Sequence, residues 1–111
     1  MNCAVKLMNI LINMRKVVIS NTVQDKIDSL RIYLIDELKL SREAAKARTY
    51  RIDDFLSSLG SQADYALCRF RKWRMLGYRC AVFEKVWVFA YETFDNGVIV
   101  RDMSHTALLV E

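Results

Sequence analysis

Proline is absent from this sequence of 111 residues, glycine occurs only three times, and there is a single histidine. A flexible linker between domains needs a stretch rich in proline, glycine or small polar residues, and we find no such stretch. The length fits one domain, and the hydrophobic residues, 53% of the chain, are enough to build a core. The sequence therefore predicts a single domain.

Cysteine is also scarce, with only Cys3, Cys68 and Cys80 in the chain. The number is odd, and no two cysteines have the two-residue spacing of a zinc-ligand motif. We therefore predict neither a disulfide framework nor a metal site, and no cofactor. Reduced thiols in a cytoplasmic protein are the simplest interpretation.

The first 15 residues are interpreted as an extension in front of a domain that spans residues 16–111. Residues 4–12 are apolar except for Lys6 and Asn9. This run is too short to cross a bilayer, which takes about 20 residues, and it lacks the charged start and the cleavage site of a signal peptide. We expect either that Met14 is the natural start or that the residues before it form an accessory arm.

One strand and two amphipathic helices are predicted in the first half of the domain. Residues 16–20 are rich in β-branched side chains, which is typical of a strand. Asn21 is a suitable N-cap, and the apolar residues that follow recur at steps of three and four, which predicts a helix over residues 22–38. Ser41 is a good N-cap for a second helix, in which Arg48 interrupts the apolar stripe and is expected to reach its rim.

Three strands are predicted in the second half, over residues 78–83, 86–94 and 98–103. Glu84-Lys85 forms a tight turn between the first two, and Asp95-Asn96-Gly97 is a strong hairpin sequence because asparagine and glycine tolerate positive φ. The predicted fold class is α+β, in the order β-α-α-β-β-β. A helical hairpin covers one face of a four-stranded, mainly antiparallel sheet, and the other face is open.

A basic window lies in front of the second strand. No acidic residue occurs between Tyr65 and Phe83, and the net charge of the chain is +4. Such a local field suits a polyanion or an acidic protein partner, and the alternative is a solvated edge. The basic residues of this window are Arg69, Arg71, Lys72, Arg74 and Arg79.

Several local sequences in this order resemble the RelE/ParE superfamily of bacterial toxins. They are the first strand at residues 17–20, Gly77-Tyr78-Arg79, the apolar strand at 86–91, the hairpin at 95–100, and Ser104-His105-Thr106 near the end. The resemblance runs from Lys16 to about Leu109, and it implies the toxin of a type II toxin–antitoxin system, neutralised by a cognate antitoxin protein.

Different branches of this superfamily act on different targets. RelE-like members cleave mRNA on the ribosome, whereas ParE-like members inhibit DNA gyrase and have no nuclease chemistry. The leading expectation is a ribosome-dependent mRNA endoribonuclease that needs no metal. A ParE-like gyrase inhibitor and an inactive member that only binds its antitoxin are the alternatives, because a shared fold does not choose between them. Whether the chain forms a homodimer is left open.

Three residues are candidates for catalysis of RNA cleavage. The resemblance implies that Arg79 contacts the phosphate, for which the planar guanidinium is well suited. His105, the only histidine, suits a proton transfer, and Arg101 is expected to share the open face with Arg79. Each candidate also has a structural interpretation: Arg79 as a rim residue, His105 as a hydrogen-bonded structural residue, and Arg101 as a solvated side chain. Asp102 is a candidate ion-pair partner of Arg101. The segment after His105 lacks the tyrosine and the arginine of the RelE branch, which keeps the non-catalytic alternatives open.

The basic window supplies the candidates for RNA binding. Arg69, Arg71, Lys72 and Arg74 are placed to clamp phosphates, and Trp73 is a candidate for stacking on an unpaired base. A core or rim position is the alternative for the tryptophan.

Overall fold

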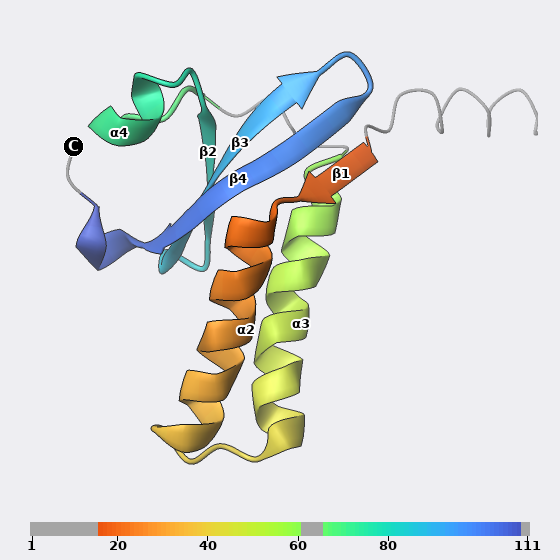
Figure 1. The fold of residues 1–111 in the computed structure, drawn as a ribbon, viewed down its shortest axis with the longest axis vertical. Helices are drawn as coiled ribbons and strands as arrows, with labels where there is room; N and C mark the ends of the chain where they lie inside the picture. Colours follow the sequence, from red (N-terminus) through yellow and green to blue (C-terminus); the bar gives the residue numbers. More distant parts are fainter. Residues whose placement is uncertain (1–15, 61–65, 110–111) are drawn as a thin grey trace, which may run out of the picture.

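The computed structural model of the chain describes residues 16–60 and 66–109, so the expected accessory arm lies outside the described residues. The described part is α+β and has the predicted order of strands and long helices (Figure 1). The elements are β1 (Lys16–Ile19), α2 (Asn21–Asp36), α3 (Arg42–Ser58), α4 (Arg71–Arg74), β2 (Arg79–Phe83), β3 (Trp87–Phe94), β4 (Gly97–His105) and a 3-10 turn, η1 (Thr106–Leu108).

The four strands form one sheet in the order β1-β4-β3-β2. Strand β4 runs antiparallel to β3, and β3 runs antiparallel to β2, whereas the short β1 lies parallel to β4 at one edge. The predicted mainly antiparallel sheet is therefore confirmed. The first described strand pairs with the last, so residues 16–19 lie beside residues 97–100.

Both long helices begin at a serine. The Ser20 hydroxyl accepts a hydrogen bond from the Val23 amide, so α2 starts one residue earlier than predicted, and Asn21 is its first residue rather than its cap. The hydroxyl of Ser41 accepts a hydrogen bond from the Ala44 amide at 3.1 Å, which confirms the predicted cap of α3. Each hydroxyl satisfies a backbone donor that has no partner inside its helix.

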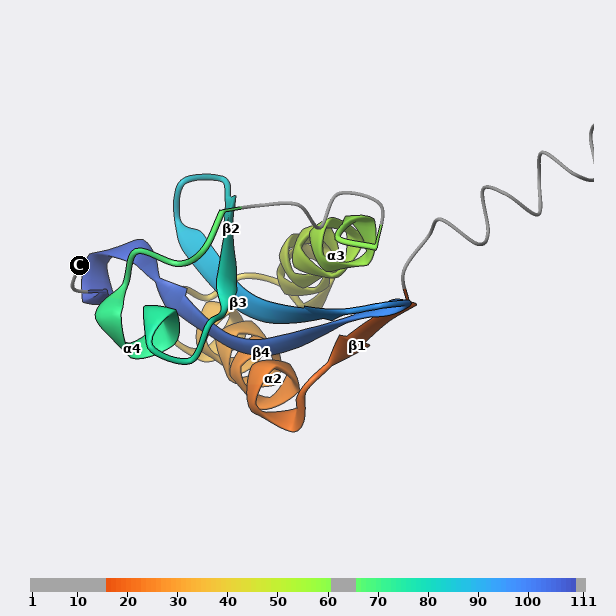
Figure 2. The same cartoon turned by 90° about the horizontal axis from the view of Figure 1, so that it is seen from above.

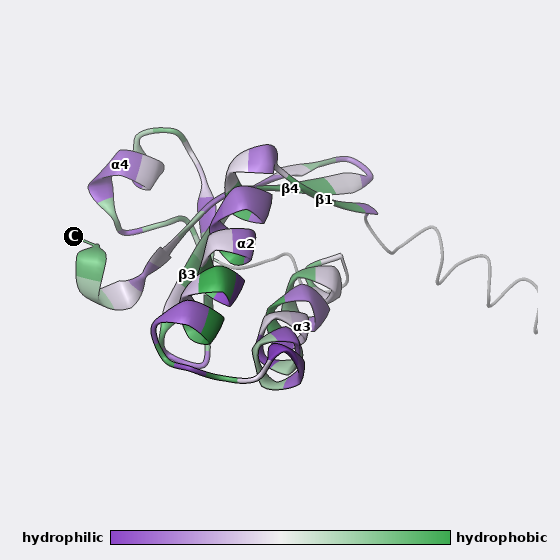
Figure 3. Ribbon diagram, turned by 60° about the horizontal axis from the view of Figure 1, so that its bottom comes forward, coloured by the Kyte–Doolittle hydropathy of each residue, from purple (hydrophilic) through white to green (hydrophobic). Residues whose placement is uncertain are grey.

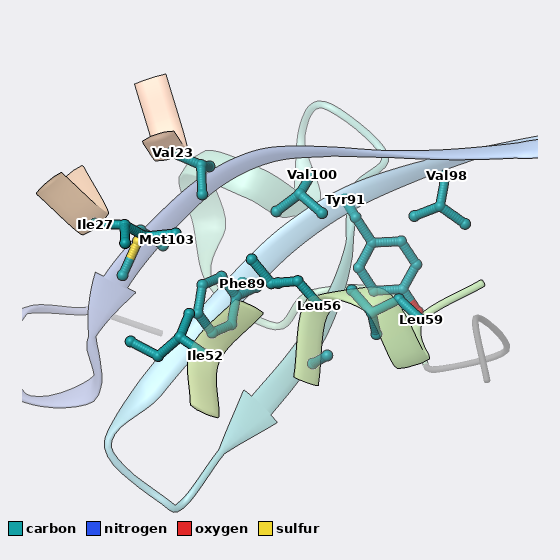
Figure 4. Packing of buried hydrophobic residues seen from close by; sticks show 11 residues of the cluster. Val23, Ile27, Ile52, Leu56, Leu59, Phe89, Tyr91, Val98, Val100 and Met103 are labelled. Atoms are coloured by element: carbon teal, nitrogen blue, oxygen red, sulfur yellow. The ribbon is translucent and has the colours of Figure 1, made fainter. Parts of the chain in front are cut away.

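The main core lies between the helical hairpin and one face of the sheet (Figure 4). Hydrophobic and hydrophilic segments alternate along both helices (Figure 3), and the buried positions of α2 and α3 include Val23, Ile27, Ile52 and Leu56. The helices and the sheet together contribute Val23, Ile27, Ile52, Leu56, Leu59, Ala81, Phe89, Tyr91, Val98, Val100 and Met103.

A second, smaller core covers part of the other face of the sheet, so the expectation that this face is open is wrong at this end of the sheet. Cys68, Phe70 and Trp73 pack against Val88 and Ala90 of β3. Alternate residues of β3 thus face two different cores, as the two-residue period of a strand requires. The segment that carries Trp73 was expected to be extended, but it contains the short helix α4, which lies at the opposite end of the sheet from β1 (Figure 2).

The two sheet hairpins form where they were predicted, but by different backbone geometry. In the turn between β2 and β3, Glu84 and Lys85 have φ of 52° and 62°, so both residues adopt the left-handed conformation. At the other hairpin Phe94 pairs with Gly97, and neither Asn96 nor Gly97 has the positive φ that was expected.

A disulfide links Cys68 to Cys80, which corrects the expectation of reduced thiols. The sequence contains no motif that pairs these residues, because they are 12 positions apart. The chain before α4 returns beside β2, with the Cys68 amide donating to the Tyr78 carbonyl at 2.9 Å and the Cys80 amide donating to the Ala66 carbonyl at 3.3 Å. This local pairing brings the two Cα atoms to 4.9 Å.

Candidate functional site

His105 occupies the last position of β4, directly opposite Trp87 on β3. The two rings meet edge to face, with their centroids 5.4 Å apart. The Nδ1 atom of His105 accepts a hydrogen bond from the Ala107 amide at 3.1 Å, which caps η1. Because Nδ1 is the acceptor, the neutral imidazole carries its proton on Nε2, which forms no hydrogen bond with the part of the chain that the structure describes.

A groove opens beside His105, between the helical hairpin and the turn from β2 to β3. Its volume is about 460 Å³. The wall is mostly apolar, and two arginines of α3, Arg48 and Arg51, stand at the groove with His105. Arg51 is paired with Glu84, whereas Arg48 is exposed and forms no ion pair with any other described residue. The apolar lining comprises Leu30, Leu34, Leu38, Ile52, Phe83, Val86 and Trp87.

Arg79 lies away from this groove. It starts β2, pairs with Tyr91 of β3, and lines a smaller hollow of about 280 Å³ near Glu92. Tyr91 and Trp87 are four residues apart, so Arg79 and His105 are separated by roughly 13 Å along the strands and by two strand spacings of about 4.8 Å across them. The two predicted catalytic residues do not converge on one phosphate in this conformation.

Arg101 is the extra residue of a β-bulge in β4, where the pairing shifts between Ala90 and Tyr91. Its guanidinium donates to the Glu92 carboxylate at 2.9 Å, so its charge is already paired. Asp102 was the expected partner of Arg101, but successive residues of a strand point to opposite faces, and the bulge turns Arg101 further away.

Asp102 instead joins three parts of the fold. Its carboxylate accepts hydrogen bonds from Lys26 of α2 at 2.6 Å, from the Met103 amide at 2.8 Å and from the Trp73 indole at 3.3 Å. Burial by itself raises the pKa of Asp102, but the hydrogen bonds from these three groups and the charge of Lys26 outweigh it, so the pKa is lowered. The carboxylate therefore stays ionised as the anchor of α4.

The basic window forms a cluster around α4. Arg69, Arg71, Lys72 and Arg74 are exposed, whereas Trp73 between them is only 2% exposed. The ammonium of Lys72 lies 4.8 Å from the centroid of the Trp73 ring. Trp73 thus offers no open face to a base, and its predicted stacking role does not fit this conformation. The core position, which was the alternative, is what the structure has.

The cluster and His105 lie on different sides of the sheet. The segment with α4 packs on the second core through Val88 and Ala90, whereas Trp87, the pairing partner of His105, packs against the main core. The predicted residues are therefore divided among the groove, the Arg79 hollow and the α4 cluster.

No sequence pattern connects Arg48, Arg51 and Trp87 with His105. Arg48 was expected at the rim of its helix, and it does line the groove, but no motif links α3 to the end of β4. No group of three or more potential metal ligands occurs among residues 16–60 and 66–109. No helix in this part of the chain is long and apolar enough to span a membrane.

The sequence matches no known protein-family model, and no curated protein is similar to it.

Proposed function

We propose that the chain is the toxin of a type II toxin–antitoxin system of the RelE/ParE kind. The proposal is supported by the order β-α-α-β-β-β with the helical hairpin on one sheet face, and by the local sequences that resemble this superfamily. The exposed basic cluster suits a large acidic target. The targets of the superfamily lie in the cytoplasm, so we propose that the chain acts there.

Within this class, one observation favours a ParE-like toxin that binds DNA gyrase without cleaving RNA: Arg79 and His105 stand at different places on the sheet. Acid–base catalysis needs its groups within hydrogen-bonding reach of the reacting atoms, about 2.6–3.2 Å. Arg101, the third candidate, is neutralised by Glu92. Binding to a protein target makes no such demand on the three residues.

The mRNA endoribonuclease is the second candidate function, and the groove is the observation in its favour. His105 and the arginines Arg48 and Arg51 line the same hollow, so one side chain suited to proton transfer stands near two cations. A phosphate bound at Arg48 would be stabilised there without a metal. The mostly apolar wall suits a nucleic acid backbone less well than a protein segment.

The groove also suits the antitoxin. An amphipathic helix binds by laying apolar side chains into a groove. Here the wall is apolar, Leu38 at its edge is 50% exposed, and Arg48 can pair with an acidic residue of the partner. A small acidic protein made from a neighbouring gene is the expected occupant.

Expression of the wild type and of His105→Ala in a growth assay, with primer extension on cellular mRNA, tests the choice between the two activities. The gyrase proposal expects that both proteins arrest growth and that no mRNA cuts appear. The ribonuclease alternative expects cuts that disappear in both His105→Ala and Arg48→Ala, because loss of the proton-transfer group slows cleavage about 10²–10⁴-fold and loss of the phosphate contact about 10²–10³-fold. Arrest by neither protein would contradict the toxin assignment itself.

A further inference from the structure

The disulfide between Cys68 and Cys80 closes the segment that carries the basic cluster. Cys68 comes just before α4, and Cys80 is the second residue of β2. The exposed Arg71, Lys72 and Arg74 lie between them. The position of this cationic helix on the sheet therefore depends on a bond that a reductant can break.

Few other contacts hold α4 in place. A helix of four residues is not stable alone, and Phe70 at its N-cap provides no side-chain hydrogen bond. The segment is held by the burial of Trp73, by its hydrogen bond to Asp102, and by the two backbone hydrogen bonds beside the disulfide. All of these contacts lie within the second core or at its border. They are separate from the main core, which lies under the two long helices.

We propose that the Cys68–Cys80 disulfide is a redox-controlled lock on α4, opened by a cellular dithiol. In the oxidised protein the segment of residues 66–78 is fixed on the sheet, and its cations form one cluster. In the reduced protein the segment detaches locally while the main core stays folded. This inference concerns the order of the segment and not its target, and it takes only the cytoplasmic location from the proposed function.

The reaction is a thiol–disulfide exchange. One thiolate of the dithiol attacks the Sγ of Cys80, forms a mixed disulfide, and expels Cys68 as a thiolate that takes up a proton. The second thiol of the reductant then attacks its own sulfur in the mixed disulfide, which releases Cys80 as a thiol. Two electrons and two protons pass to the protein, and the dithiol becomes a disulfide.

The burial of the two cysteines matches this route. Cys68 is 1% exposed, whereas Cys80 is only half-buried, so the attack is expected at Cys80. Disulfides in cytosolic proteins are usually transient and redox-sensing, in contrast to the permanent disulfides of secreted domains. A lock that opens and closes with the thiol state of the cell is consistent with this pattern.

Hydrogen–deuterium exchange with mass spectrometry tests the proposal on the full chain. The protein is compared after mild oxidation with glutathione disulfide and after reduction with dithiothreitol. We expect that amides of residues 66–78 exchange about tenfold or more faster in the reduced protein, and that amides of α2, α3 and β3 are unchanged. The intact mass confirms the loss and the return of two hydrogens.

Variants separate the disulfide from other effects of the reductant. The double variant Cys68→Ser and Cys80→Ser should exchange like the reduced wild type without any dithiothreitol. The control Cys3→Ser should behave like the wild type in both states. Equal exchange of the segment in both states, unfolding of α2 and α3 on reduction, or failure of the disulfide to form would each overturn the proposal.

Discussion

The indole of Trp73 donates a hydrogen bond to the carboxylate of Asp102, from the short helix α4 to the central strand β4. The other oxygen of this carboxylate accepts from Lys26 of α2. Trp73, in the middle of a basic sequence, is therefore an internal anchor. The partly buried carboxylate of Asp102 connects α4 on one side of the sheet with α2 on the other.

Loss of this anchor is expected to destabilise the domain. Asp102→Ala removes the acceptor of three hydrogen bonds and leaves the Trp73 indole without a partner, which costs about 1–3 kcal/mol in the free energy of unfolding. Glu92→Ala, which breaks the more exposed pair with Arg101, should cost less than about 1 kcal/mol. Urea denaturation measures both values, and equal losses would show that Asp102 is not an anchor.

The stability that Asp102 contributes should depend on pH. Its pKa in the folded protein is below the ordinary value of 3.8, because the hydrogen bonds from Lys26, Met103 and Trp73 outweigh the opposite effect of burial. A lowered carboxyl pKa gives stability that is fully present above the unfolded pKa and is lost as the pH falls through the folded pKa.

The difference in unfolding free energy between the wild type and Asp102→Asn should therefore be constant above about pH 5 and shrink as the pH falls below about 4. Urea denaturation in a series of buffers measures it. A difference that grows with acidity would show that the carboxyl group is bound more favourably in its protonated form.

Trp73→Ala should destabilise the domain by about 3–5 kcal/mol, because it removes a large, fully buried side chain from the second core. The control Tyr50→Ala replaces a side chain that is 54% exposed on α3, and its cost should stay within about 0.5 kcal/mol. Thermal or urea denaturation compares the two. A small effect of Trp73→Ala would mean that the ring is available at the surface, as its candidate role in stacking on a base requires.

The periodic parts of the fold could be predicted from the sequence. The apolar steps of three and four predicted both long helices, because each helix buries one face. The continuous apolar run in residues 86–91 predicted β3, which is buried on both faces. The segment around α4 could not be predicted in this way. Its four-residue helix is too short for a period, and its core residues, Cys68, Phe70 and Trp73, are spaced among exposed cations.

The candidate site was predicted in part. His105 ends β4, two residues beyond the predicted end of this strand, and the basic residues next to Trp73 are exposed. The separation of Arg79 from His105 follows from the register of β2, β3 and β4, which no local sequence reveals. The groove arises from α3 and a strand turn that meet only in the folded protein.

Charge reversal in the groove should weaken antitoxin binding. Arg48→Glu puts an anion in place of an exposed cation that forms no ion pair within residues 16–60 and 66–109. The anion repels an acidic helix and should lower affinity about tenfold or more. Arg42→Glu, at the exposed start of α3, makes the same change in charge outside the groove and should have little effect. Titration of each purified variant with the protein encoded by the neighbouring gene gives the two affinities. Equal affinities would place the antitoxin elsewhere on the surface.

The supercoiling activity of purified DNA gyrase, measured with increasing amounts of this protein, tests most directly whether the chain acts by binding to a protein target. We expect the wild type and His105→Ala to inhibit supercoiling at the same concentrations, because His105 has no proton transfer to perform. The antitoxin should reverse both inhibitions. Undiminished supercoiling at saturating protein, from a preparation that cuts mRNA on ribosomes only when His105 is intact, would contradict the account.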